Sequence, residues 1–145
     1  MEAVRAAINT NLIGALATAH AAAPRLLAHG GSVLMIASSV GLSASPRLVG
    51  YGASKAAVIQ LTRTLAREWA DRGVRVNTLC PGYVETDLTR ELLVVDHLRA
   101  RILADTPQGR LGTLEEIVQP ALFLLSDAAS YITGAVLTAD GGMST

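Results

Sequence analysis

The sequence predicts a single α/β domain over residues 1–145, in which helices cover a parallel sheet. Segments with the composition of helices alternate along the chain with short apolar segments typical of strands. The first of these apolar segments, residues 33–37, contains no polar side chain, as expected for a strand covered on both faces. Alternation of this kind is typical of parallel strands joined by right-handed crossovers.

The chain begins with a long segment that favours a helix. Residues 2–28 are rich in alanine and leucine, and two glycines at 30–31 are typical of a helix end. We expect Pro24 to bend or loosen the last turns. The strand at 33–37 follows, and a polar loop containing glycine, serine and proline extends from residue 38 to 50.

A second helix is predicted over residues 51–71, where apolar side chains recur every four positions along one side. These side chains are Ala57, Leu61, Leu65 and Trp69. Gly73 ends this helix, and residues 74–79 predict the second strand. A more polar amphipathic helix is expected over residues 87–104.

The last third of the chain contains a clear helix start. Thr113 and Glu116 have the spacing of a capping box, which predicts a helix over residues 114–126. Pro120 lies inside this segment, and because an interior proline costs about 3 kcal/mol we expect a kink there or a late helix start. Residues 135–139 predict a final strand.

The composition excludes several classes of function. The chain is 50% hydrophobic and 17% charged with zero formal net charge, which indicates a globular protein that binds neither nucleic acid nor acidic membranes. Residues 6–24 carry no formal charge, but Asn9, Asn11 and His20 argue against a membrane span. Cys80 is the single cysteine, and with no evident export signal we expect a cytoplasmic protein.

The pair Tyr51 and Lys55 is the most informative feature of the sequence. Four positions apart at a helix start, the two side chains share one face, and a nearby ammonium favours the phenolate and lowers the pKa of a tyrosine. Ser38 follows the predicted strand, at the sheet edge where open α/β folds bind ligands, and can polarise a carbonyl. Taken alone, however, Tyr-x-x-x-Lys is also common as a surface pair.

Five motifs occur in order along the chain. They are Asn11-Leu-Ile-Gly14, Ser38-Ser-Val-Gly41, Tyr51-x-x-x-Lys55, Asn77-x-x-x-Pro81-Gly82-x-Val84-x-Thr86 and Gly134-x-x-Leu137-x-x-Asp140-Gly141-Gly142. In this combination the chain resembles the classical short-chain dehydrogenase/reductase family. The resemblance implies a Rossmann-like, doubly wound parallel sheet, of which the three predicted strands are similar to the fifth, sixth and seventh.

The resemblance also implies four catalytic residues. Tyr51 would be the general acid in carbonyl reduction and the general base in alcohol oxidation. Lys55 would hold the nicotinamide ribose and lower the pKa of Tyr51, and Ser38 would hydrogen-bond to the reacting oxygen. Asn11 would help to hold a water that links Lys55 to solvent, although an asparagine inside a helix can also simply bond to the backbone.

A further part of the resemblance concerns the cofactor, NAD or NADP. The residues implied to bind it are Tyr51, Lys55, Pro81, Gly82, Val84 and Thr86. Val84 would act through its backbone and Thr86 through its hydroxyl, while the alternative for Thr86 is to cap the next helix. No metal site is predicted, because the histidines lack the spacing of metal ligands.

The implied function is hydride transfer between a nicotinamide cofactor and a small carbonyl or alcohol substrate, as in a 3-oxoacyl reductase or a small alcohol or sugar dehydrogenase. Residues 87–108 correspond to a variable substrate lid, and its apolar side chains predict only a partly apolar pocket. These side chains are Leu92, Leu93, Val94, Val95 and Leu98. Members of the family pair through helices that correspond to residues 2–28 and 52–71, which implies a homodimer or homotetramer.

One expected part of such an enzyme does not occur in the sequence. The chain contains no strand, glycine-rich turn and helix that would hold the cofactor pyrophosphate at a helix N-terminus. We therefore expect a fragment of a longer reductase or a misplaced start at Met1. The alternative is a complete but inactive chain that acts only as a dimerisation module. In either case the strand at 33–37 should have an unpaired edge, which favours aggregation.

Overall fold

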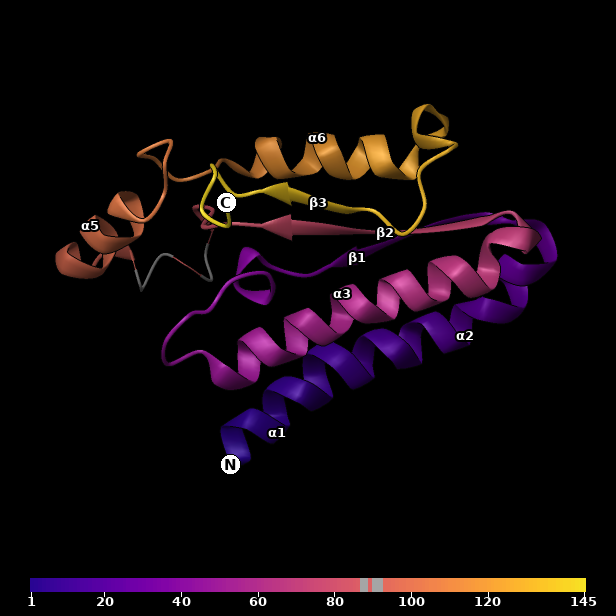
Figure 1. Ribbon diagram of the computed structural model, residues 1–145, viewed down its shortest axis with the longest axis horizontal. Helices are drawn as coiled ribbons and strands as arrows, with labels where there is room; N and C mark the ends of the chain where they lie inside the picture. The colour runs from indigo at the N-terminus through magenta and orange to yellow at the C-terminus, as the bar shows by residue number, and fades with distance from the viewer. Residues whose placement is uncertain (87–88, 90–92) are drawn as a thin grey trace.

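The computed structural model describes residues 1–86, 89 and 93–145. Three parallel strands, β1 (Gly31–Ile36), β2 (Val74–Pro81) and β3 (Val136–Ala139), form one sheet in the order β1-β2-β3. Figure 1 shows α6 (Leu114–Leu125) on one face of this sheet, and α2 (Gly14–His29) and α3 (Val49–Trp69) on the other. This three-layer arrangement confirms the predicted α/β fold.

The predicted N-terminal helix is present but not uniform. It consists of α1 (Glu2–Ile8), a π-helical segment η1 (Asn9–Ile13) and α2, which continues through Pro24 and ends at Gly30 with φ 74°. π-helical turns are rare and often lie at functional sites. Within the described residues, no helix combines the length and the hydropathy that crossing a membrane requires.

Helix α3 packs against both α1 and the sheet. It begins two residues before the predicted start, and its approach to α1 is so close that a Cβ on Gly50 would lie 2.9 Å from Val4 Cα. The buried residues of α3 share one face and are Gly50, Ser54, Val58, Ile59, Thr62, Leu65, Ala66 and Trp69. Of the predicted apolar side chains, Ala57 and Leu61 lie at the margin of this face and are only partly buried.

The prediction that residues 33–37 form a strand covered on both faces is wrong. Met35 and Ala37 are buried, but the side chain of Ile36 is 49% exposed. The reason is the position of β1, which pairs with β2 alone in the described part of the chain. The expected unpaired edge is therefore present there.

Helix α6 begins at the residue that the sequence predicts. The capping box of Thr113 and Glu116 is formed, and α6 runs from Leu114 through Pro120 to Leu125, so the late start is wrong. Helix α5 (Asp96–Ala104) forms the second part of the predicted helix over residues 87–104. Residues 87–88 and 90–92 of that prediction lie outside the described residues.

Arg75 joins the sheet to the end of α6. Its guanidinium donates to the carbonyl oxygens of Leu124, Leu125 and Ser126 at 2.8, 3.2 and 3.0 Å. These carbonyls lack partners inside the helix, and a cation at a helix C-terminus is also favoured by the helix dipole. The contact therefore holds α6 against β2.

Buried polar side chains tie β2 to its neighbours. Thr78 Oγ1 on β2 donates to Thr62 Oγ1 on α3 at 2.6 Å, and Thr62 Oγ1 donates to Val58 O at 3.0 Å. Asn77 donates to Ile132 O at 2.9 Å and accepts from Ala135 N at 3.0 Å, which fastens the approach to β3. Asn77 thus joins β2 to the segment that leads into β3.

The Thr62–Thr78 pair makes a testable prediction about stability. Thr62→Val leaves the buried Thr78 hydroxyl without its acceptor, so the free energy of unfolding should fall by about 1–3 kcal/mol. The double variant Thr62→Val/Thr78→Val removes both partners and should recover most of that loss. Urea unfolding measures both changes, with Thr64→Val on the exposed side of α3 as control. A double variant less stable than Thr62→Val would contradict this account.

Candidate active site

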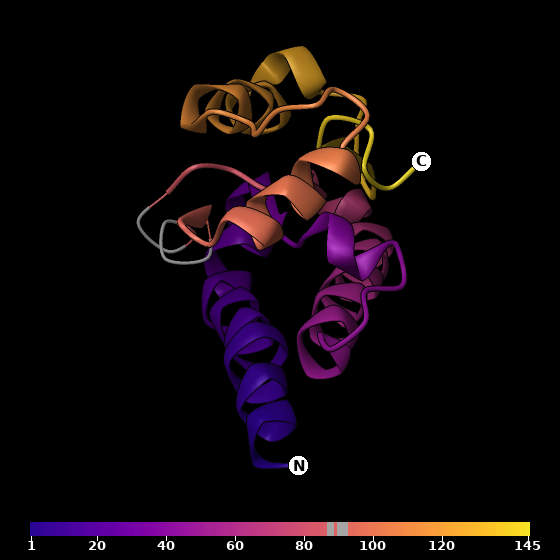
Figure 2. The ribbon, with the colours of Figure 1, turned by 90° about the vertical axis from the view of Figure 1, so that its left-hand side faces the viewer.

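Ser38, Tyr51 and Lys55 lie together at the carboxyl end of β1. Ser38 follows the strand by two residues, Tyr51 lies in the first turn of α3, and Lys55 lies one turn later. Lys55 Nζ donates to Ile36 O at 2.9 Å and lies 5.7 Å from the centroid of the Tyr51 ring. Lys55 therefore joins the end of β1 to the start of α3, at the end of the sheet that faces the viewer in Figure 2.

A short 3-10 turn, η2 (Ser39–Gly41), sets the position of Ser38. Ser38 Oγ accepts from Val40 N at 3.3 Å, so the hydroxyl proton can still be donated to another group. A Cβ on Gly41 would lie 2.9 Å from both Ala56 N and Lys55 C. The absence of a side chain at Gly41 is what brings the Ser38 segment onto the backbone of α3.

The surroundings of Lys55 are partly apolar. Burial lowers the pKa of the Lys55 ammonium from its ordinary value, because a low-dielectric environment disfavours the charged form. Cys80, at the end of β2, is fully buried, and burial raises the pKa of its thiol. A buried, neutral thiol fits the packing role expected for Cys80.

The structure connects Asn11 to the turn that carries Tyr51. Asn11 Nδ2, in the π-helical segment, donates to Ser54 Oγ at 2.9 Å, and Ser54 Oγ donates to Tyr51 O at 2.7 Å. The Asn11 side chain is thus bonded to a neighbouring helix and not to its own backbone, while its role in holding a water stays a prediction. Ser54 is not among the site residues predicted from the sequence. Its position, a small polar residue about one helical turn after Tyr51, could have indicated it.

The predicted cofactor loop starts at the carboxyl ends of β2 and β3. Pro81 is the last residue of β2, and Gly82 N donates to Ala139 O at 3.0 Å. A Cβ on Gly82 would lie 2.7 Å from Asp140 Cα, so any other residue would push the two segments apart. Gly82 therefore holds this loop against the end of β3.

The rest of this loop pairs with the segment before α6. Val84 is buried and forms an isolated parallel bridge with Gly112. Thr89 Oγ1 accepts from Thr86 N at 3.0 Å, and the two threonine hydroxyls lie 3.2 Å apart. The backbone of the loop is therefore fixed on both sides of Val84, and the backbone N–H of Thr86 is bonded to the side chain of Thr89.

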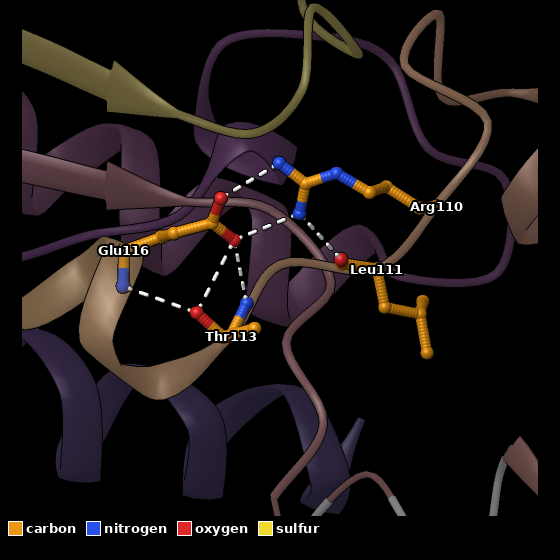
Figure 3. A network of polar contacts seen from close by, with 4 residues as sticks. All are labelled: Arg110, Leu111, Thr113 and Glu116. Carbon is orange, nitrogen blue, oxygen red and sulfur yellow. Dashed lines mark hydrogen bonds and ion pairs between the residues drawn. The ribbon is translucent and has the colours of Figure 1, made fainter.

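An exposed network of polar contacts supports the segment that pairs with Val84. Figure 3 shows Arg110 bonded through both terminal nitrogens to Glu116, at 2.8 and 2.6 Å, while Glu116 also accepts from Thr113 N at 2.9 Å. The hydrogen bond from Arg110 and the bond from Thr113 lower the pKa of Glu116 to about 2. The network thus anchors the start of α6 on either side of Gly112.

A cleft of about 560 Å³ opens between the loop after β1 and helix α5, and its lining begins at Ser39, the residue after Ser38. Figure 2 shows these two segments next to each other at the strand ends. The apolar side chains that line the cleft are Val40, Ala44, Pro46, Leu48, Leu98, Ile102 and Met143. Of the apolar side chains expected to form the pocket, Leu98 lines this cleft, whereas Leu93, Val94 and Val95 do not; Leu93 is buried and Val94 is 72% exposed. Leu92 lies outside the described residues.

Comparison with known proteins gives consistent matches over nearly the whole chain. The family described as Enoyl-(Acyl carrier protein) reductase matches residues 1–144. The 3-oxoacyl-(acyl-carrier-protein) reductase of Chlamydia trachomatis is 44% identical over 138 residues, which is 94% of this chain and 54% of that protein. The chain therefore spans about half the length of the curated relatives it matches.

Solved structures match in the same way. A gluconate 5-dehydrogenase from Burkholderia cenocepacia, in complex with NADP and tartrate, superposes with a TM-score of 0.94 and 34% identity, covering 98% of this chain and 56% of that chain. A short-chain type dehydrogenase/reductase from Mycobacterium ulcerans gives a TM-score of 0.94 and 35% identity, covering 99% of this chain and 52% of that one.

The lowered pKa of Glu116 predicts how stability depends on pH. A carboxylate whose pKa falls from 4.5 to about 2 on folding stabilises the fold above about pH 4.5, and this contribution is lost as the pH falls towards 2. We expect Glu116→Gln to be less stable than the parent chain at pH 7, with the difference shrinking between pH 4.5 and 2. Glu115→Gln, one residue away, is the control. Denaturant unfolding at each pH would contradict this if the difference stayed constant.

Proposed function

The chain belongs to the classical short-chain dehydrogenase/reductase family, and from that premise we propose that it supplies the proton-transfer residues of an NAD(P)-dependent oxidoreductase. The observation that carries this proposal is that Lys55 lies next to the Tyr51 ring and also bonds to the end of β1. Its ammonium lies 5.7 Å from the Tyr51 ring centroid and is bonded to the strand end that leads into Ser38.

The residues at the strand ends fit the nicotinamide end of a dinucleotide. An ammonium has three protons, and within the described residues Lys55 gives one of them to Ile36 O, so two can be donated to ribose hydroxyls. Pro81, Gly82, Val84 and Thr86 belong to a loop that begins at the same end of the sheet. NADP in the related gluconate 5-dehydrogenase supports the cofactor class. When bound, the cofactor donates or accepts the hydride.

Tyr51 is the proposed proton carrier. In reduction, the Tyr51 hydroxyl gives its proton to the carbonyl oxygen as the carbonyl carbon gains a hydride, and in oxidation the phenolate removes the proton of the alcohol. Tyr51 is 38% exposed, so its hydroxyl can reach a substrate at the strand ends. Ser38 donates a hydrogen bond to the same oxygen, which stabilises negative charge there.

Lys55 and Asn11 complete the proposed catalytic set. The ammonium of Lys55 lies 5.7 Å from the centroid of the Tyr51 ring, where it can bind the nicotinamide ribose beside the proton carrier. Asn11 is joined to Tyr51 through Ser54, which accepts from Asn11 and donates to Tyr51 O. Asn11 is proposed to hold the water through which Lys55 exchanges protons with solvent. The bond from Ser54 to Tyr51 O keeps this turn of α3 in place.

The substrate is proposed to be a small carbonyl compound or the corresponding alcohol. Relatives named as a 3-oxoacyl-(acyl-carrier-protein) reductase and a gluconate 5-dehydrogenase support this range. The cleft of about 560 Å³ beginning at Ser39 has room for either type of group. A purely structural, dimerisation role is less well supported, because it would leave the contacts of Tyr51 and Lys55 without a purpose.

Assembly into a homodimer or homotetramer through residues 2–28 and 52–71 is part of the proposal. Two apolar side chains of the N-terminal helix support it, since Ile13 is 50% and Leu16 is 42% exposed. Burial of such side chains between subunits would be favourable.

Replacing Tyr51 tests the proposed function. Tyr51→Phe removes the proton carrier and keeps the ring, so turnover should fall by about 10²–10⁴-fold while cofactor affinity changes little. Turnover is measured with NADH and NADPH in the longest polypeptide that the reading frame around this chain encodes. Tyr131→Phe, at a fully exposed position, is the matched control. Unchanged turnover in Tyr51→Phe would exclude the role given to this residue.

A second prediction concerns residues 1–145 alone. They contain the nicotinamide end of the proposed site but no glycine-rich turn for the pyrophosphate, which normally contributes much of the dinucleotide affinity. Calorimetry should therefore detect no binding of NAD or NADP at micromolar concentrations. A micromolar dissociation constant would show that these residues hold the cofactor by another route.

A further inference from the structure

We propose that the cleft beginning at Ser39 takes a substrate with an oxyanion group, a carboxylate or a phosphate, and that Arg47 binds this group. The inference rests on the proposed function, because it treats the cleft as the substrate site. It goes further by naming the charge of the substrate and the residue that selects for it.

Along the chain, one wall of the cleft lies between Ser38 and Tyr51. This wall is the loop from Ser39 to Leu48, which starts directly after Ser38 and ends three residues before Tyr51. The opposite wall contains Leu98 and Ile102 of α5. An aliphatic substrate between these walls would have its reacting end near Ser38 and its remaining length along the loop.

The charged side chains that line the cleft leave a positive excess. They are Arg47, Arg101 and Asp105. Arg101 Nε lies 3.7 Å from Asp105 Oδ2, so these two charges largely offset each other. Arg47 forms no ion pair or side-chain hydrogen bond with the residues that the structure describes. Its guanidinium presents two parallel N–H groups, which match the two oxygens of a carboxylate or phosphate.

The backbone at Arg47 is a second, independent observation. Arg47 has φ 71°, the one left-handed conformation among the described non-glycine residues. Glycine or asparagine occupies this conformation at less cost, because a Cβ there crowds the backbone. A long cationic side chain at a strained position is expected where the side chain itself is needed, since strain of this kind gathers at ligand sites. If this position needed only a turn, glycine would adopt the left-handed conformation at lower cost than arginine.

Binding of small probes tests the proposal without cofactor or turnover. The 145-residue chain is titrated with butyrate, monobutyl phosphate and 1-butanol, which share a four-carbon chain and differ in the head group. The methyl resonance of Met143 reports on the cleft, and that of the buried Met35 is the internal reference. We expect at least one of the two anions to bind about tenfold more tightly than 1-butanol, as a charged hydrogen bond would give. The stronger of the two identifies the oxyanion.

Variants then assign the effect to Arg47. Arg47→Gly should abolish the preference for anions while the thermal midpoint stays equal or rises, because glycine suits the left-handed backbone. Arg47→Lys should keep part of the preference. Arg99→Met, two residues before Arg101 on α5 but outside the cleft lining, should change nothing.

Two results would overturn the proposal. One is equal affinity for butanol and both anions, and the other is an anion preference that survives Arg47→Gly. Either result leaves the proposed function standing, because Tyr51→Phe tests that separately by turnover.

Discussion

The site depends on one close contact, between the backbone of Gly41 and the backbone of α3. Any side chain at Gly41 would lie within 2.9 Å of the Lys55 carbonyl carbon, so the turn after β1 could not approach the helix as it does. This contact brings Ser38 to the helix turn that carries Tyr51. Lys55 then closes the arrangement from the helix side, through its bond to Ile36 O. Ser38, Tyr51 and Lys55 are thus placed by the packing of the turn after β1 against α3 and by the hydrogen bond from Lys55 to Ile36 O.

Much of this arrangement could be predicted because its determinants are local. The four-residue spacing of Tyr51 and Lys55 places both on one helix face, and a serine after an apolar strand must lie at the ligand-binding edge of the sheet. The partial exposure of Ile36 and the bond between Asn11 and Ser54 depend on which element lies next to which. The left-handed backbone of Arg47 has no local signal either, since arginine does not favour it.

Lys55 also explains how the end of β1 is satisfied beside the proposed active site. Ala37 N donates to Leu79 O on β2, and successive residues of a strand bond to opposite sides, so Ile36 O faces away from β2. A strand end would otherwise leave this carbonyl without a protein partner in the described sheet. The ammonium of Lys55 fills that place, which partly buries the charge and lowers the pKa of Lys55. The same side chain therefore satisfies the strand end and lies beside Tyr51.

The two halves of the proposed site are held by interactions of different physical kinds. The Ser38 turn is fixed by close backbone packing and buried residues, which respond little to salt or to mild acid. The loop around Val84 is paired with Gly112, whose flanks are anchored by the exposed Arg110–Glu116 pair. Charges at the surface are screened by salt, and protonation of Glu116 removes the pair altogether. Acid and salt should therefore loosen the proposed cofactor loop while the proposed proton-transfer residues keep their arrangement.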